Sequence, residues 1–274
     1  MCKKLLLLFL LVFGVGLSAE VKDKFKINIG TMYITNFETE MAVSKDPIPL
    51  SVGINTQEQL NMKSDTNVLS LGGYYRFSDA HSIDFSYFSV NSKGHISLTQ
   101  EIEWGDKTIG AGAYVDSFFD IDIYKLSYGY SFYHNDKVEL VITAGLHITD
   151  IDLGISANGN IERADGSVVP SDYYAETGNG ILPLPVVGFK GQYTILDKRL
   201  FVNYKFEYFY LKYDDYEGRI TSSELNFEYH FVDHVGIGIG YNSNKIFAEM
   251  DDGDLNVQAA NDLEGALVYF TYIY

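Results

Sequence analysis

Short segments in which apolar and polar residues alternate one by one recur along this chain, and they constrain its fold more than any other feature. In residues 25–37 the odd positions read Phe, Ile, Ile, Thr, Tyr, Thr and Phe, while the even positions include Lys, Asn and Gly. The same pattern recurs in residues 200–210, 225–231, 235–241 and 266–274. Because successive side chains of a strand point to opposite faces, a period of two predicts strands with one apolar face. No stretch shows helical periodicity, so we predict an all-β chain.

About ten such segments can be placed, an even number, and eight is the nearest alternative. The predicted strands span residues 24–37, 66–77, 82–103, 116–133, 137–156, 182–196, 199–213, 218–231, 235–249 and 263–274. The connections at 78–81, 134–136, 197–198 and 232–234 are tight, those at 38–65, 104–115, 157–181 and 250–262 are long, and 214–217 is a short exception. This alternation predicts an antiparallel up-and-down barrel with long external loops, short periplasmic turns and both termini on the periplasmic side.

The first 19 residues have the layout of a secretory signal peptide. Two lysines precede a short apolar run, and small residues follow up to Ala19. We therefore expect 1–19 to be removed and 20–274 to form one barrel domain with a net charge of −17 − 2 = −19. Cys2, the only cysteine, would leave with the signal peptide, which excludes disulfides and cysteine-based metal sites. Such an acidic chain has little to neutralise phosphates, so no nucleic acid partner is expected.

Alternation alone does not say which face points outward, because a soluble lipocalin-like barrel shows the same pattern turned inside out. The polar face carries charges that suit a hydrated lumen better than a dry core. Tyrosines cluster at the strand ends, as in the aromatic girdles of membrane barrels. These features favour a transmembrane barrel with lipid outside. Pro183 and Pro185 would interrupt a ladder, so the paired part of their strand is expected to begin near Val186.

The last predicted strand ends on alternating aromatics, Phe270, Tyr272 and the carboxy-terminal Tyr274. With this strand, the whole segment 25–274 resembles the Gram-negative outer-membrane β-barrel proteins as a class. The resemblance implies an outer-membrane location among outer-membrane lipid and lipopolysaccharide. It also implies that the terminal strand is read by the barrel-assembly machinery.

Charged residues on the lumen side form the first candidate site. They are Arg76, Asp84, Lys190, Lys205, Glu207, Glu224 and Glu228. Because buried charges must be paired or hydrated, we expect an ion-pair network, with Arg76 and Asp84 facing each other across the turn at 78–81. The network would act either as a polar plug or as the selectivity element of a small pore. A glycine row at 236, 238 and 240 favours open lumen space, and histidines 81, 134, 230 and 234 are expected to be solvated.

Aspartates at the outer ends of two neighbouring strands form the second candidate site. They are Asp120, Asp122, Asp150 and Asp152. Carboxylate oxygens suit Ca²⁺ or Mg²⁺, and divalent ions also bridge lipopolysaccharide, so a divalent-cation rim is one interpretation and a solvated acidic surface is the other. No other metal site and no cofactor is predicted.

Two catalytic arrangements complete the candidates. His95-Ile-Ser97 resembles the His-x-Ser element of lipid A 3-O-deacylases, with Glu101 and Glu103 as the nearest carboxylates, although Leu98-Thr99 replaces that family's Asn-Ala. A resemblance to omptin proteases would pair His147 with Asp150 opposite Asp120 and Asp122. We expect a non-enzymatic barrel with a structural or surface-interaction role, a small passive channel as the first alternative and a surface hydrolase as the second.

Overall fold

The computed structural model describes residues 23–45, 48–64, 67–104, 107–163, 168–196, 199–251 and 255–274. The expected signal peptide, residues 1–19, and the expected turn at 197–198 lie outside these described residues. Among the described residues, no helix has the length and apolar character needed to cross a bilayer.

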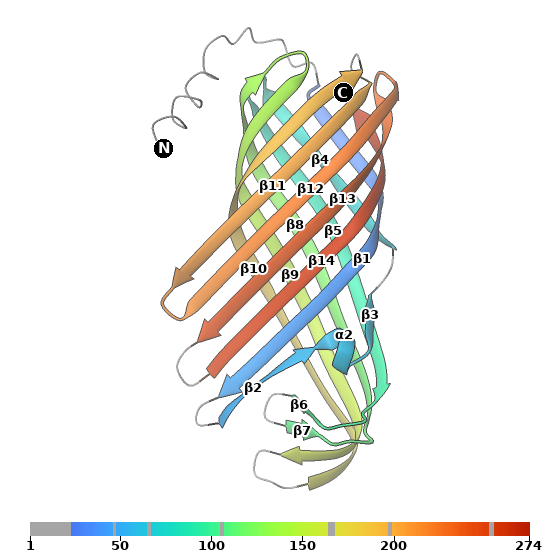
Figure 1. Ribbon diagram of the computed structural model, residues 1–274, viewed down its shortest axis with the longest axis vertical. Helices are drawn as coiled ribbons and strands as arrows, with labels where there is room; N and C mark the ends of the chain where they lie inside the picture. The colour runs from blue at the N-terminus through green and yellow to red at the C-terminus, as the bar shows by residue number, and fades with distance from the viewer. Residues whose placement is uncertain are drawn as a thin grey trace, which may run out of the picture.

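Ten long antiparallel strands form the wall of a closed barrel (Figure 1). They are β1 (Phe25–Lys45), β4 (Asn67–Ser78), β5 (His81–Ser97), β8 (Tyr114–His134), β9 (Val138–Arg163), β10 (Val168–Leu196), β11 (Leu200–Tyr213), β12 (Tyr216–Val232), β13 (Val235–Asp251) and β14 (Leu255–Ile273). Each pairs with its neighbour in the chain, and pairing between β1 and β14 closes the ring. The predicted up-and-down barrel of ten strands is confirmed.

Both ends of the described chain meet at the end of the barrel that carries the short turns. The backbone N–H groups of Lys24 and Phe25 donate to the carbonyl oxygen of Tyr274 at 2.6 and 2.9 Å. The connections from β4 to β5 and from β12 to β13 each span only two residues. This end is the periplasmic end, as the loop lengths predict.

The opposite, outer end differs from the prediction because much of the expected loop sequence is strand. β9 and β10 stay paired from Val138↔Tyr193 to Glu162↔Val168, so most of the expected loop 157–181 is a hairpin. β13 and β14 likewise stay paired up to Asp251↔Asn256, within the expected loop 250–262. The physical reason is that continued pairing satisfies the backbone N–H and C=O groups of both strands.

The expected loop 38–65 is also mostly ordered secondary structure. β1 continues to Lys45 and pairs with the short strand β2 (Ile48–Asn55). The one-turn helix α2 (Thr56–Gln59) follows, and β3 (Met62–Ser64) then pairs with β5. Two further short strands, β6 (Ile102–Trp104) and β7 (Lys107–Ile109), extend the wall beside β9.

The outer surface of the periplasmic half is an apolar belt bounded by two tyrosine girdles. Exposed aliphatic and aromatic side chains cover all the long strands, for example Ile29, Leu126, Ile142, Phe227 and Phe270. The outer girdle contains Tyr33, Tyr124, Tyr208 and Tyr241, and the inner girdle contains Tyr75, Tyr130, Tyr193 and Tyr272. An apolar surface of this extent requires hydrocarbon around it, so the barrel spans a membrane.

β8 shows how the two faces of the wall exchange polarity at the outer girdle. Below Tyr124 its outward residues are aromatic or aliphatic, while Lys125 and Ser127 point inward. Beyond Tyr124 the inward residues Ile121 and Ile123 are apolar and buried, and the adjacent outward residues Asp120 and Asp122 are acidic. The lumen is therefore polar inside the membrane and apolar outside it. A soluble lipocalin-like barrel, with its apolar face inward throughout, is wrong for this chain.

Candidate functional site

The charged residues inside the membrane-spanning half form separate clusters rather than one network. The first cluster is centred on Glu228, which is 1% exposed. The ammonium group of Lys26 donates to both of its carboxylate oxygens, at 2.7 and 2.9 Å. His230 Nε2 lies 2.6 Å from Oε1, and the hydroxyl of Tyr269 donates to Oε2 at 3.0 Å. His230 is buried here, so the prediction that it is solvated is wrong.

The second cluster is centred on Glu207, which is also almost fully buried. Lys205 Nζ lies 2.9 Å from its carboxylate, Lys125 Nζ lies 3.8 Å away, and the hydroxyl of Ser127 donates to it at 3.1 Å. Lys125 also donates to Ser222 Oγ and Asn244 Oδ1, both at 2.7 Å. Strands β8, β11, β12 and β13 thus contribute to one cluster that crosses the lumen.

Arg76 and Asp84 both point into the lumen, but they do not pair with each other as predicted. Arg76 donates to both carboxylate oxygens of Glu139 at 2.8 and 3.1 Å, and Lys190 donates to Asp84 at 2.6 Å. The register explains the difference, because Arg76 lies opposite Ser82 rather than opposite Asp84. Each side chain instead reaches a partner on β9 or β10, which barrel closure brings near.

A polar cavity of about 120 Å³ lies among these clusters. Its lining includes the charged groups Lys26, Asp84, Glu139, Lys190, Lys205 and Glu224. Glu224 accepts a hydrogen bond from Asn226, which also lines the cavity. A polar space of this size accommodates a few ordered waters.

The glycine row on β13 does not provide open space. A Cβ at Gly238 would lie 2.1 Å from Cζ of the Tyr269 ring, and one at Gly240 would lie 1.8 Å from Oδ1 of Asn226. The absent side chains are replaced by side chains from the neighbouring strands β12 and β14. The expectation of open lumen space at this row is therefore wrong.

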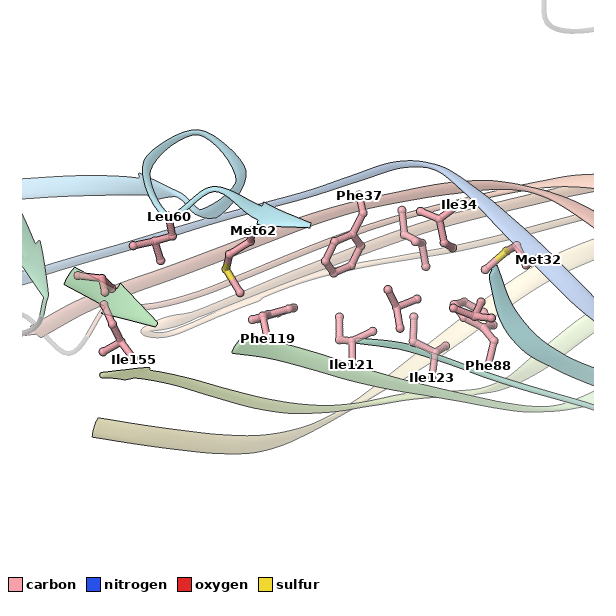
Figure 2. Packing of buried hydrophobic residues seen from close by; sticks show 14 of the residues in the cluster. Met32, Ile34, Phe37, Leu60, Met62, Phe88, Phe119, Ile121, Ile123 and Ile155 are labelled. Atoms are coloured by element: carbon pink, nitrogen blue, oxygen red, sulfur yellow. The ribbon is translucent and has the colours of Figure 1, made fainter. Parts of the chain in front are cut away.

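The outer half of the lumen is filled by buried apolar side chains, which we call the apolar plug. It comprises Met32, Ile34, Phe37, Leu60, Met62, Val68, Phe88, Val90, Leu98, Ile102, Ile109, Ala113, Val115, Phe119, Ile121, Ile123, Ile155, Ala157, Leu263 and Leu267, and it extends inward to Tyr269, whose hydroxyl belongs to the Glu228 cluster. In Figure 2, side chains from opposite walls point toward one another, and Leu60 and Met62 join them from the segment around α2. The wall and this inserted segment together form one apolar cluster.

The four aspartates of the predicted cation rim do come together, on the outward face just beyond the outer girdle. Asp120 lies opposite Asp152 and Asp122 lies opposite Asp150 in the β8–β9 ladder. The hydroxyl of Tyr87 donates to Asp122 at 2.9 Å. Within the described part of the chain, no three acidic, histidine or cysteine side chains are arranged to hold a metal ion. A divalent-cation rim therefore stays a prediction.

The two predicted catalytic arrangements have different outcomes. His147 is fully buried and points inward, whereas Asp120, Asp122 and Asp150 lie on the outward face, so the omptin-like arrangement is wrong. His95 and Ser97 are both exposed on β5. The Nδ1 atom of His95 hydrogen-bonds Asp116, its partner in the β8 ladder. The carboxylate that contacts His95 is thus Asp116, which the sequence hypothesis did not pair with it.

Two exposed ion pairs lie at the outer end of the barrel. Lys245 pairs with Asp262 at 2.5 Å and Lys212 with Glu217 at 3.1 Å. In each case the hydrogen bond to the carboxylate raises the pKa of the lysine.

Sequence reasoning missed Lys26, Lys125, Glu139 and His147 as lumen residues. Lys26 and Lys125 lie on the polar face of strands with alternating polarity, so the alternation of side chains could have identified them as lumen residues. The partners could not be found this way, because they lie across the lumen.

Comparison with known proteins identifies the fold. No protein-family model and no curated protein sequence matches the chain. Among solved structures, the outer membrane protease OmpT of Escherichia coli matches with a TM-score of 0.59 and 11% identity, covering 96% of this chain and 100% of that chain. OprG of Pseudomonas aeruginosa matches at 0.33 with 12% identity, covering 94% and 99%. Ail of Yersinia pestis matches at 0.25 with 9% identity, covering 90% and 99%. The match to OmpT supports the fold, an antiparallel β-barrel, and the apolar belt indicates that this barrel spans a membrane.

Proposed function

We propose that this chain is a non-conducting outer-membrane barrel that presents an acidic, extracellular β-structure to partners at the cell surface. The observation that carries this proposal is the apolar plug. Side chains such as Met32, Phe88 and Ile121 are buried across the outer half of the lumen, directly above the ion-pair clusters. An apolar cluster that spans the lumen raises the barrier to a hydrated ion path.

Conductance of the refolded barrel in a planar bilayer tests the proposal. We expect no discrete steps from protein whose folding is verified by its heat-dependent migration on gels. A protein with the plug weakened by Phe119→Ser and Ile121→Ser serves as the comparison. Reproducible steps from the wild type would overturn the proposal and favour the passive-channel alternative.

The outer surface of the barrel also suggests its partners in the envelope, which are lipopolysaccharide, divalent cations and the barrel-assembly machinery. The outward aspartates beyond the girdle face the headgroup side, where divalent ions would bridge Asp120, Asp122, Asp150 and Asp152 to lipopolysaccharide. Wild type should then melt at a higher temperature with Ca²⁺, and Asp120→Asn with Asp122→Asn should remove the shift. Equal shifts in both proteins would reject this cation rim. The exposed aromatics of the terminal strand, Phe270, Tyr272 and Tyr274, would contact the barrel-assembly machinery.

A surface hydrolase is the second candidate, and the hydrogen bond between His95 and Asp116 favours it. A carboxylate that orients an imidazole is the arrangement that activates a neighbouring hydroxyl, here that of Ser97. His95 lies eight residues beyond Tyr87 on β5, about 26 Å along the strand from the outer girdle. That distance disfavours lipid A acyl chains and favours an ester in the extracellular layer.

Ester hydrolysis by the purified barrel tests this candidate. Ser97→Ala and Asp116→Asn should each abolish turnover, while Ser89→Ala, another serine on β5, should not. Turnover that survives Ser97→Ala, or wild-type protein without turnover, would reject the hydrolase.

A further inference from the structure

The ladder between β10 and β11 stops while both strands continue outward. Its last pair is Val187 with Tyr208, a member of the outer girdle. Beyond this pair β10 remains bonded only to β9, and β11 remains bonded only to β12 as far as Tyr213. In Figure 1 the orange β11–β12 hairpin ends well short of the wall formed by β8, β9 and β10. We call this interruption the β10–β11 split.

A similar interruption on the opposite side of the barrel is sealed. The β1–β4 ladder ends at Tyr33 and Asn67, at the same girdle. There, β2 pairs with β1, β3 pairs with β5, and α2 bridges them. The backbone N–H of Thr39 donates to Gln57, and Thr56 donates back to the carbonyl of Thr39. Among the residues that the structure describes, an inserted segment covers the first interruption and none covers the β10–β11 split.

The inner side of the β10–β11 split is apolar. Leu184 and Val186 of β10 pack with Ile220 of β12 and Ile246 of β13, and the partly buried Leu182 and Phe209 adjoin them. Further outward, Gly180 is exposed, and a Cβ built there would meet nothing within 4 Å. The inner side of the split is therefore apolar, and only Leu182 and Phe209 of this cluster are left partly uncovered by the protein.

Pro183 and Pro185 lie directly at the split and decide what kind of occupant fits. Proline has no N–H, so an extended peptide or a second copy of β10 would lack two donors where it would need a ladder. A hydrocarbon chain needs no donors. The outward neighbours Ile181 and Val187 are among the most exposed apolar residues, at 66% and 63%.

We propose that the β10–β11 split binds the acyl chain of an outer-leaflet lipid against the partly buried Leu182 and Phe209. The chain would enter sideways at the girdle, where the ladder ends, and cover apolar surface that the protein itself does not pair. This site is independent of the apolar plug and of the hydrolase candidate.

Quenching by lipids with brominated acyl chains tests the proposal. Trp104, the single tryptophan, is replaced by Phe, and Phe209→Trp places a reporter on the inner side of the split. Refolded in such vesicles, this reporter should lose as much fluorescence as the lipid-facing Phe227→Trp. The lumen control Phe88→Trp should lose little. Leu182→Trp is a second reporter if Phe209→Trp folds poorly.

The decisive experiment closes the β10–β11 split with a disulfide. If the antiparallel ladder continued beyond Val187↔Tyr208 in the same register, Val186 would pair with Phe209 and Pro185 with Tyr210. The mature chain is expected to lack cysteine, so Pro185→Cys with Tyr210→Cys gives one disulfide. Oxidation should reduce quenching of Trp at 209 to the Phe88→Trp level, and reduction should restore it. Quenching that is low in both states, or unchanged by oxidation, would overturn the proposal. Disulfide-linked dimers of Pro185→Cys would instead identify a second copy as the occupant.

Discussion

The Glu228 cluster makes a quantitative prediction about stability. Glu228→Gln keeps the shape of the side chain but removes the charge that neutralises Lys26. The two side chains are 2% and 9% exposed, so the lysine ammonium would remain buried without a counter-ion. Breaking one partner of a buried pair costs about 3–5 kcal/mol, and we expect the free energy of unfolding to fall by that amount.

The exposed pair between Lys245 and Asp262 is the matched control. Its nitrogen–oxygen distance is 2.5 Å, but its side chains are 53% and 36% exposed. Water compensates the loss of such a partner, so Asp262→Asn should cost only about 0–1 kcal/mol. The two substitutions change the same number of charges and differ chiefly in burial.

Urea unfolding of the refolded barrel in vesicles, followed by tryptophan fluorescence, measures both costs. The double variant Lys26→Met with Glu228→Leu removes both charges and should unfold near the wild-type urea concentration, because apolar replacement of a buried pair is often neutral. The reasoning is refuted if Glu228→Gln costs no more than Asp262→Asn. That result would mean that lumen water screens the pair and that the cluster contributes little.

Three further outcomes follow from the packing and the topology. Gly238→Leu should prevent folding because its side chain would occupy the position of the Tyr269 ring, and Tyr269→Ala should rescue it, as a gel-migration assay would show. Phe119→Ala should lower the free energy of unfolding by about 3–5 kcal/mol, since it leaves a cavity in the apolar plug; a loss below about 1 kcal/mol in urea would mean that the plug is loosely packed. A cysteine at Asp215, in the β11–β12 turn, should react with an impermeant maleimide on intact cells, whereas one at Asp79 should react only after permeabilisation; the reverse would invert the topology.

The strands and their two faces could be predicted because alternation is a local property. Residues 235–241 show it plainly, and β13 follows it residue by residue. The extent of the wall beyond the membrane could not be predicted in the same way. Segment 157–181 contains four glycines, three asparagines and Pro170, which are typical of loops, yet β9 and β10 pair through most of it. The expectation for Val186 was half right, since pairing with β11 begins at Val187 while pairing with β9 continues past both prolines.

The lumen partners are harder to predict because they depend on closure of the barrel. Lys26 and Glu228 are 202 positions apart, and Lys125 and Asn244 are 119 apart. The odd or even position of a residue in its strand predicts that its side chain points inward. Which inward side chains meet depends on the tilt and register of all ten strands. Arg76 shows the consequence: a partner chosen across the nearest turn was wrong, and the true partner lies on β9.

The outer boundary of the membrane nevertheless has a sequence signature, a change of phase in the alternation. In β8 the apolar residues occupy odd positions from Phe119 to Ile123 and even positions from Tyr124 to Tyr130. In β9 they occupy even positions from Ile142 to Ile148 and odd positions from Ile151 to Ala157. The β8–β9 register is continuous through both points, so each position parity keeps the same face of the wall. What changes at these points is the environment on each face. Two adjacent strands that change phase at paired positions, here Ile123↔Thr149 and Tyr124↔Ile148, therefore locate the boundary where a lipid-facing belt gives way to an apolar core.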